Sequence, residues 1–246
     1  MRRYVFLDLD DTLFQVRRKC PEGELVEPIA YSLNGQPLSF ITDRQREFFR
    51  WLAEGADIIP TTARSIDSYQ RVKLPFHGYA ICSFGGIVLM PDGSYDPDWH
   101  AYIAPKAEKY KGNLAIAAKE IKDCVDRLKL DIRISIISDA GSDFYVSVKH
   151  NQAQLPDLKV ITDFIRHSIP LDWCIHLNEN NLALLPPYLG KEAAVSWFIK
   201  KYINVQESLL IGVGDSITDA NFIALCNYAL IPTKSQLFTS FLQENQ

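Results

Sequence analysis

An apolar run near the start of the chain ends in a cluster of carboxylates, and this feature constrains the fold most. Residues 4–7 read Tyr-Val-Phe-Leu, and Asp8, Asp10 and Asp11 follow them. A continuous apolar run is typical of a strand covered on both faces, as in parallel α/β sheets. Because a buried carboxylate is costly unless it is paired or binds a metal, either the strand ends in a polar turn or the aspartates have a function.

Bulk composition argues against several classes of protein. The chain has 246 residues, of which 47% are apolar and 23% charged, so it can form one large globular domain or two smaller ones. Its net charge of −4 and its lack of a long basic block argue against a nucleic-acid partner. No apolar run reaches the length of a membrane span, and Asp8 interrupts the first one too early for a signal peptide, so no membrane association is expected.

Cysteine usage indicates the compartment. The chain contains five cysteines, which are scattered and form no CxxC pair. An odd number at such spacings predicts neither a disulfide framework nor a zinc cluster. Because reduced thiols are typical of the cytosol, we expect a cytoplasmic protein.

At both ends of the chain, short apolar segments typical of strands alternate with segments of helical periodicity. Asp43 suits the N-cap of one of these helices. The elements expected before residue 90 are strands at 4–7 and 57–60, a hairpin at 29–42, helices at 43–54 and 65–72, and an apolar segment at 78–90 broken by Gly85 and Gly86. Those expected after residue 187 are helices at 191–202 and 217–225 and strands at 208–214 and 228–232. Such alternation predicts a parallel α/β sheet.

The middle of the chain shows a different pattern, in which each helix is followed by two strands. The expected elements are helices at 105–128 and 157–168 and strands at 131–138, 144–150, 172–178 and 181–186. The order α-β-β-α-β-β indicates a separate α+β insert of about 100 residues, within the usual range of a domain. We therefore predict an α/β fold: a Rossmann-like, doubly wound parallel sheet core from 1–87 and 187–246, with an αββαββ domain inserted at 88–186.

Polar residues gather where the predicted parallel strands end, which is where open α/β sheets bind their ligands. These residues are Asp8 and Asp10, then Thr61 to Arg64, then Lys191, and finally Asp215 and Asp219. Carboxylate oxygens suit Mg²⁺, and an aspartate can attack phosphorus to form an aspartyl-phosphate. A metal and a lysine would offset the repulsion between the two anions, and a second carboxylate could serve as general acid and base.

This pattern resembles the haloacid dehalogenase superfamily of phosphohydrolases. The stretch Asp-Leu-Asp-Asp-Thr at 8–12 is similar to its DxDxT signature, and Thr62, Lys191 and the stretch 214–219 match its second, third and fourth motifs. The four motifs occur in the family order and span nearly the whole chain. The insert resembles a C2-type cap, as in Cof-like, sucrose-phosphate and trehalose-phosphate phosphatases and phosphomannomutases.

The resemblance implies roles for the four aspartates. Asp8 would be the nucleophile, with its other oxygen on Mg²⁺. Asp10 would be the general acid and base, with its backbone carbonyl on the metal. Asp215 would bind Mg²⁺, and Asp219 would support either the metal shell or the lysine.

The resemblance also implies that Thr62 and Lys191 hold the phosphoryl oxygens. Two alternatives stay open for the threonine: Thr62 could serve only as a helix N-cap, and Thr61 could take its place if the register differs by one. Lys191 at a helix start is disfavoured by the helix dipole, which argues against a purely structural role. Arg64 is interpreted as a surface or salt-bridge residue rather than a substrate clamp.

The chain departs from the family pattern at several positions. Ala63 and Phe84 stand where many relatives have Gly and Asn, and Thr218 stands where many have Asn. The segment 15–42 is unusually long and leaves the first strand beside Asp8, so it is expected to form a flap over the site.

The leading hypothesis is a phosphatase, a hydrolase of class EC 3.1.3.-. It would use Mg²⁺ and hydrolyse a small phosphorylated metabolite, such as a sugar phosphate, through an aspartyl-phosphate. The alternatives are a phosphomutase, which is a phosphoryl transferase, and a non-catalytic phosphosugar-binding protein. The sequence identifies neither the substrate nor the oligomeric state, because fold does not specify function.

Overall fold

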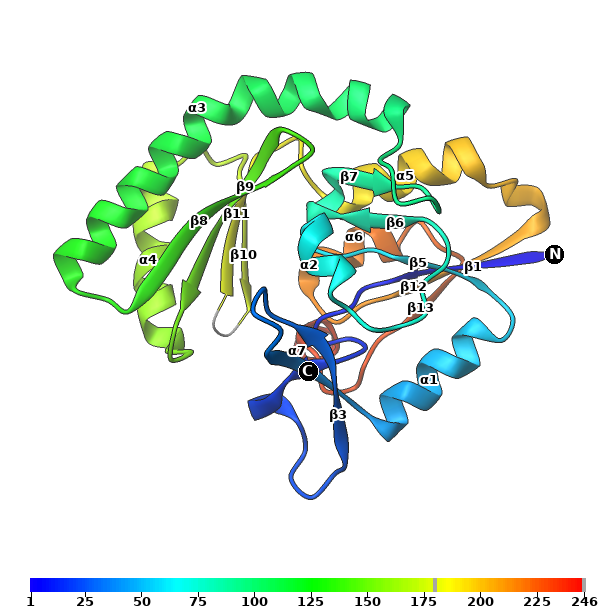
Figure 1. Ribbon diagram of the computed structural model, residues 1–246. Coiled ribbons are helices and arrows are strands. Elements are labelled where there is room, and N and C mark those ends of the chain that lie inside the picture. Colours follow the sequence, from blue (N-terminus) through cyan, green and yellow to red (C-terminus); the bar gives the residue numbers. More distant parts are fainter. Residues whose placement is uncertain (179–180, 245–246) are drawn as a thin grey trace. The chain divides into compact units, whose positions relative to one another are not determined.

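The computed structural model describes residues 1–178 and 181–244 (Figure 1). The chain divides into two compact units, one formed by Met1–Asp96 and Lys191–Gln246 and the other by Pro97–Gly190. The boundaries expected from the sequence, 87/88 and 186/187, lie before these.

The first unit is built around a parallel sheet with the strand order β13-β12-β1-β5. Its strands are β1 (Arg2–Leu7), β5 (Asp57–Pro60), β12 (Ser208–Val213) and β13 (Tyr228–Leu230). The chain adds β5 on one side of β1 and later returns to add β12 on the other side. This reversal makes the sheet doubly wound and places its switch point between β1 and β12, where such sheets bind ligands.

The apolar segment at 78–90 forms a hairpin rather than a helix-linked strand. Strands β6 (Ala80–Cys82) and β7 (Ile87–Leu89) are antiparallel, and a parallel bridge between Thr61 and Ile81 joins β6 to the end of β5. The connection η2 (Ser83–Gly85) holds Ser83 and Phe84 at φ of 51° and 53°. Two successive left-handed residues of this kind are strained, a feature that clusters at functional sites.

The segment 15–42 forms a small antiparallel sheet with the order β2-β4-β3. Its elements are β2 (Gln15–Val16), η1 (Arg17–Lys19), β3 (Val26–Tyr31) and β4 (Pro37–Thr42). The predicted hairpin at 29–42 corresponds to β3 and β4, with Gly35 at φ +76° in the turn. The predicted N-cap Asp43 is wrong, because Thr42 caps α1 (Asp43–Ala53). The Thr42 hydroxyl accepts from the Gln45 backbone amide, and the Gln45 side chain accepts from the Thr42 backbone amide.

Helices complete the first unit. They are α2 (Ile66–Gln70), α5 (Lys191–Tyr202), η3 (Val205–Glu207), η4 (Ile217–Asp219), α6 (Ala220–Ile223) and α7 (Gln236–Glu244). The single helix expected at 217–225 is wrong, because a capping box between Ser216 and Asp219 closes one short 3-10 turn before α6 begins. Helix α7 was not predicted.

The second unit has the predicted order of elements, α-β-β-α-β-β. They are α3 (Pro97–Leu128), β8 (Ile132–Asp139), β9 (Ser142–His150), α4 (Leu155–Ser168), β10 (Cys174–Asn178) and β11 (Asn181–Leu185), and the strands form an antiparallel sheet with the order β10-β11-β9-β8. The turn expected between the last two strands includes Glu179 and Asn180, which lie outside the described residues. The helix expected from 105 begins at Pro97, because Trp99 and Ile103, both 1% exposed, extend its buried face beyond Pro105.

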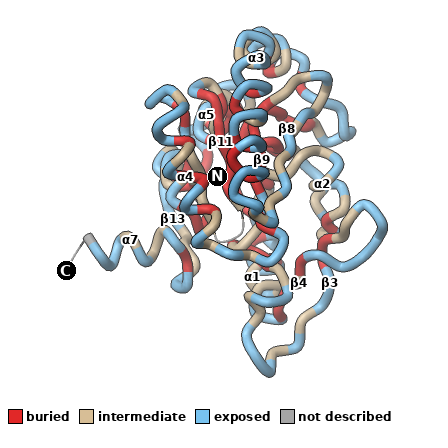
Figure 2. The backbone as a smooth tube through the Cα atoms, turned by 90° about the vertical axis from the view of Figure 1, so that its left-hand side faces the viewer, coloured by how far each residue is buried: buried red, intermediate tan, exposed pale blue. Residues whose placement is uncertain are grey.

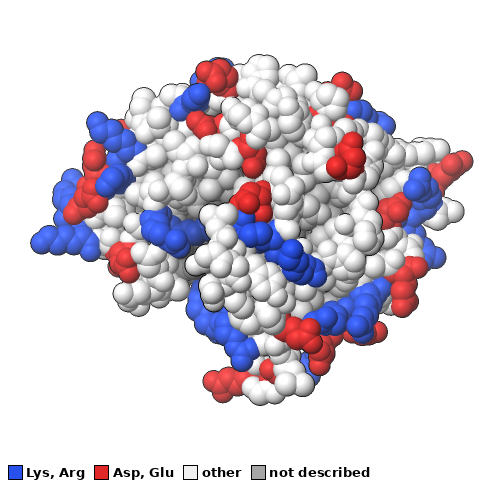
Figure 3. Space-filling model, viewed as in Figure 1, with Lys and Arg blue, Asp and Glu red and all other residues white. Residues whose placement is uncertain are grey.

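Burial follows the strands of both sheets (Figure 2). Val5, Phe6 and Leu7 of β1 have no exposed surface, as expected for a strand covered on both faces. Among the described residues, no helix has both the length and the apolar character that crossing a bilayer requires. The face in Figure 3 carries Lys and Arg interspersed with Asp and Glu rather than a single basic surface.

Candidate active site

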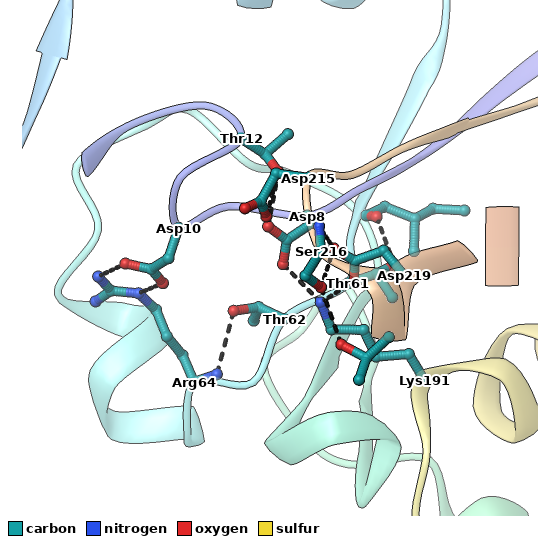
Figure 4. A network of polar contacts seen from close by, with 12 residues as sticks. Asp8, Asp10, Thr12, Thr61, Thr62, Arg64, Lys191, Asp215, Ser216 and Asp219 are labelled. Carbon is teal, nitrogen blue, oxygen red and sulfur yellow. Dashed lines mark hydrogen bonds and ion pairs between the residues drawn. The ribbon is translucent and has the colours of Figure 1, made fainter. Parts of the chain in front are cut away.

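The pairing of β1 with β12 brings two distant aspartates to one point. The register aligns Leu7 with Val213, and the Asp8 amide continues the ladder by donating to the Val213 carbonyl at 2.9 Å. Asp215 follows β12 and lies beside Asp8, both 5% exposed (Figure 4). The Thr12 hydroxyl links the two side chains, at 2.9 Å from Asp8 Oδ2 and 3.2 Å from Asp215 Oδ1.

Lys191 contacts the same cluster from the start of α5. Its Nζ donates to Asp8 Oδ1 at 2.6 Å and to Asp219 Oδ1 at 2.7 Å, and the residue is 5% exposed. The rings of Phe84 and Phe222 lie 6.0 and 5.7 Å from Nζ. An ammonium group this deeply buried requires opposite charges at contact distance, and the two carboxylates supply them.

Asp219 is fully engaged with its neighbours. Besides Lys191 at Oδ1, its Oδ2 accepts the Ser216 amide at 3.0 Å and the Ser216 hydroxyl at 2.7 Å. Gly214 lets the loop approach this closely, because a Cβ there would lie 2.6 Å from Asp219 Cβ. Of the two roles left open for Asp219, these contacts favour support of Lys191.

The end of β5 supplies two buried threonines that differ in their contacts. Thr61 Oγ1 donates to the Ile59 carbonyl at 3.1 Å, so its hydrogen is used within its own strand. Thr62 Oγ1 instead accepts the Arg64 amide at 3.1 Å, which leaves its hydrogen for a ligand. Ser65 rather than Thr62 is the N-cap of α2. The geometry therefore favours Thr62 over Thr61 as a phosphate contact.

Asp10 lies apart from this cluster and pairs with Arg64. Arg64 Nε donates to Asp10 Oδ2 and Nη2 donates to Oδ1, each at 2.7 Å. In Figure 4 the Asp10 carboxylate points toward Arg64 and away from Lys191. The interpretation of Arg64 as a salt-bridge residue is confirmed. The sequence did not indicate its partner, because the two residues are 54 positions apart.

The buried cluster carries an excess of negative charge. Burial raises the pKa of Asp8 well above its usual value, and Lys191 offsets this only in part. Burial, together with the charges of Asp219 and Asp11, raises the pKa of Asp215 to about 7. Burial also acts to raise the pKa of Asp219, but the Lys191 ammonium and the Ser216 hydrogen bonds outweigh it and lower that pKa. One ammonium therefore does not neutralise three carboxylates.

The donor set fits a hard divalent cation. Asp8, Asp215 and Asp219 each offer an oxygen, and these oxygens lie within 4.8 Å of one another. Asp219 already accepts three hydrogen bonds from Lys191 and Ser216, so Asp8 and Asp215 are the side chains better placed for Mg²⁺. Carboxylate oxygens of this kind are its preferred protein ligands, and its charge would offset the surplus described above.

Three contributors to the site were missed from the sequence. Thr12 links the two aspartates, Ser216 holds Asp219, and Asp11 adopts φ of 66° and pairs with Lys19 at 2.6 Å. A signal for the first two existed: both are hydroxyl residues within the motifs 8–12 and 214–219. The Asp11 pair with Lys19 depends on how η1 folds back and had no local signal.

Comparison with known proteins shows the fold. No protein-family model matches the chain, and no curated protein matches its sequence. A protein from Thermoplasma acidophilum matches with a TM-score of 0.61 at 16% identity, over 98% of this chain and 89% of its own. The sucrose-phosphatase of Synechocystis sp., solved with sucrose and phosphate, matches with a TM-score of 0.53 at 14% identity, over 99% and 88%.

A haloacid dehalogenase-like hydrolase from Bacteroides thetaiotaomicron matches with a TM-score of 0.54 at 10% identity, over the full length of both chains. The chain thus shares its fold with these three proteins. The predicted fold class, a doubly wound α/β core with an αββαββ insert, is confirmed.

Proposed function

We propose that this chain, with its haloacid dehalogenase-like phosphatase fold, is a Mg²⁺-dependent phosphomonoesterase that uses Asp8 as its nucleophile. One observation carries the proposal. Asp8 and Asp215 converge at the carboxyl ends of adjacent parallel strands, and the Lys191 ammonium lies 2.6 Å from Asp8 Oδ1. A carboxylate, a cation and a divalent metal site at one point are what attack on an anionic phosphate requires.

The reaction would proceed in two displacements. Asp8 Oδ1 attacks phosphorus, the bond from phosphorus to the leaving oxygen breaks, and Asp10 gives a proton to that oxygen. Water then attacks the aspartyl-phosphate and gives its proton to Asp10. The bond from phosphorus to Asp8 breaks, which releases inorganic phosphate and restores both carboxyl groups. Lys191 and Thr62 would hold the other phosphoryl oxygens throughout.

Asp8, Asp215 and the backbone carbonyl of Asp10 would hold Mg²⁺, and Asp219 would keep Lys191 in place. When bound, the ion supplies positive charge that offsets the repulsion between the attacking carboxylate and the phosphate. Asp8 Oδ2 and Asp215 Oδ1 both lie within hydrogen-bond distance of the Thr12 hydroxyl, and this proximity supports assigning the two carboxylates to one cation.

The substrate would be a small phosphorylated metabolite, and the likeness to a sucrose-phosphatase supports a sugar phosphate. The domain at 88–186 would act as a C2-type cap that selects this substrate and excludes water during attack. A cytoplasmic setting would suit such a metabolite enzyme.

Hydrolysis of p-nitrophenyl phosphate with Mg²⁺ tests the proposal. Asp8→Asn removes the nucleophile but keeps the shape of the side chain, so we expect activity to fall by more than about a thousandfold. Asp57→Asn, an exposed carboxylate on β5, serves as the matched control and should keep wild-type activity. Equal activity in the Asp8 variant and the wild type would overturn the mechanism. Free phosphate released in step with nitrophenol would distinguish hydrolysis from transfer to another sugar.

A further inference from the structure

The contact between Arg64 and Asp10 is a planar fork rather than a single charge contact. Both carboxylate oxygens are bound at 2.7 Å, one by Nε and one by Nη2. Such a bidentate pair fixes the orientation of the carboxylate as well as its position. The Arg64 side chain is 11% exposed and that of Asp10 is 47% exposed. The arginine is therefore the anchored partner, and the aspartate is the one that solvent or a ligand can reach.

Three further residues contact the guanidinium of Arg64. Nη2 donates to Ser39 Oγ of β4 at 3.3 Å, and Nη1 donates to the carbonyl and hydroxyl oxygens of Ser68 in α2, both at 3.3 Å. The group also lies over the ring of Phe14, 5.2 Å from its centroid. Ser39 and Phe14 are buried, so this support is part of the folded core rather than a surface contact.

The same turn joins Arg64 to the threonine assigned to phosphate. The Arg64 amide donates to Thr62 Oγ1 at 3.1 Å, and the Arg64 carbonyl accepts the Ser83 amide at 2.8 Å. On the other side of the fork, Asp10 and Phe14 form a bridge, and the Asp11 amide donates to the Phe14 carbonyl at 2.7 Å. The loop after β1 and the loop after β5 are thus tied together through Arg64.

We infer that Arg64 is a positioning residue that orients Asp10 for proton transfer to the leaving oxygen, and that the β2-β4-β3 sheet holds Arg64 in this orientation. The inference rests on the proposed function. It also gives the segment 15–42 a role, since Ser39 belongs to that sheet and Phe14 immediately precedes it.

Leaving-group chemistry separates this role from a merely structural one. An alkyl alcohol is a poor leaving group and needs a proton as its bond to phosphorus breaks, whereas nitrophenolate leaves readily without one. The ratio kcat/KM covers the steps up to the loss of the leaving group, and therefore includes this proton transfer. A residue that orients the general acid must affect alkyl phosphates more than p-nitrophenyl phosphate.

The test compares kcat/KM for glycerol 2-phosphate and p-nitrophenyl phosphate in wild type, Arg64→Gln, Arg64→Lys, Asp10→Asn and the Asp10→Asn/Arg64→Gln double variant. We expect Arg64→Gln to lose about a hundredfold on the alkyl probe and less than about tenfold on the nitrophenyl probe. Arg64→Lys should resemble it, because an ammonium group cannot form the fork. The double variant should show the same ratio of losses as Asp10→Asn alone, because Arg64 acts through Asp10.

Arg71→Gln is the matched control, because Arg71 also pairs with an aspartate, Asp67, and donates to the Tyr31 carbonyl of β3. It should leave the ratio of the two probes unchanged. Equal losses on both probes in Arg64→Gln, or a further change of the ratio in the double variant, would overturn the inference. Either result leaves the proposed function intact as long as Asp8→Asn is inactive. Wild-type activity in Asp8→Asn would instead remove the proposed function itself.

Discussion

Two groups of charged side chains in the first unit differ in burial and in charge balance. Asp8, Asp215 and Asp219 share a single ammonium, that of Lys191, and each of these four residues is at most 5% exposed. The pair of Asp10 and Arg64 is neutral overall, and its carboxylate is 47% exposed. The comparison teaches that the first group carries surplus negative charge, as the proposed Mg²⁺ site would need, whereas the second is balanced by its own arginine and keeps a solvent-accessible carboxylate.

The largest expected effect comes from removing the one ammonium of the buried group. Lys191→Met leaves Asp8 and Asp219 buried without their counter-charge, which should lower the free energy of unfolding by about 3–5 kcal/mol. Activity should fall by at least about a thousandfold, because the cation on the phosphoryl group is lost as well. Thermal melting and p-nitrophenyl phosphate hydrolysis measure the two effects. Lys200→Met, exposed on the same helix, is the control, and a matching change there would contradict the assignment.

The proposed metal requirement of the buried group provides the next test. Mg²⁺ should raise the melting temperature of the wild type. At a hundredfold excess over its dissociation constant, it should add about 2.7 kcal/mol to the free energy of unfolding. Asp215→Asn should lose both this shift and the activity, and chelation of the ion should inactivate the wild type reversibly. An Asp215→Asn protein stabilised by Mg²⁺ as strongly as the wild type would show that this residue is not a ligand. Asp92→Asn, an exposed aspartate in a turn, should behave as wild type.

The two threonines after β5 test which hydroxyl faces the phosphate. Thr62→Val removes the hydroxyl whose hydrogen is available, so kcat/KM should fall by about a hundredfold. Thr61→Val removes a hydroxyl that already donates to the Ile59 carbonyl, so kcat/KM should change by less than about threefold. The free energy of unfolding should fall by about 1 kcal/mol. The reverse order of effects would mean that Thr61 is the ligand. Both variants keep the side-chain shape, so each serves as the control for the other.

The smallest effect should follow from weakening the support of Asp219. Ser216→Ala removes one of its hydrogen bonds and the cap of η4 but keeps the backbone amide contact at 3.0 Å. Stability should fall by about 1 kcal/mol, with a few-fold loss of activity. Asp219→Asn should be more damaging, because it weakens the pairing of Lys191. If Ser216→Ala proved the worse of the two, Asp219 could not be acting through Lys191.

Parts of the fold with a strong local pattern were predictable. The strand at 4–7, the αββαββ order and the helix at 191–202 all follow from apolar periodicity, which reflects burial directly. The failures lie at the starts of two helices. Apolar periodicity predicted a helix from residue 105, yet buried Trp99 and Ile103 extend α3 to Pro97. Thr42 became the N-cap in place of Asp43 because Gln45 completes its capping box.

The site divides in the same way. The residues proposed for chemistry were found from their types, their order and their places at strand ends, because parallel strands bring their carboxyl ends to one edge whatever lies between them. Ser216 and Thr12 belonged to recognised motifs, but their partners did not follow from them. The structure also favours Thr62 over Thr61, because the direction of a hydroxyl depends on backbone geometry that no residue pattern encodes.

By itself, the sequence determined the parallel core and the inserted domain, and it suggested the chemistry that we propose, because periodic burial and the chemical types of side chains are local properties. Only the tertiary structure decided which charges meet. Lys191 pairs with Asp8 across 183 positions and Arg64 pairs with Asp10 across 54. Such pairs form because strand register and burial leave each charge no better partner, and both are set by the whole packed unit rather than by any segment of it.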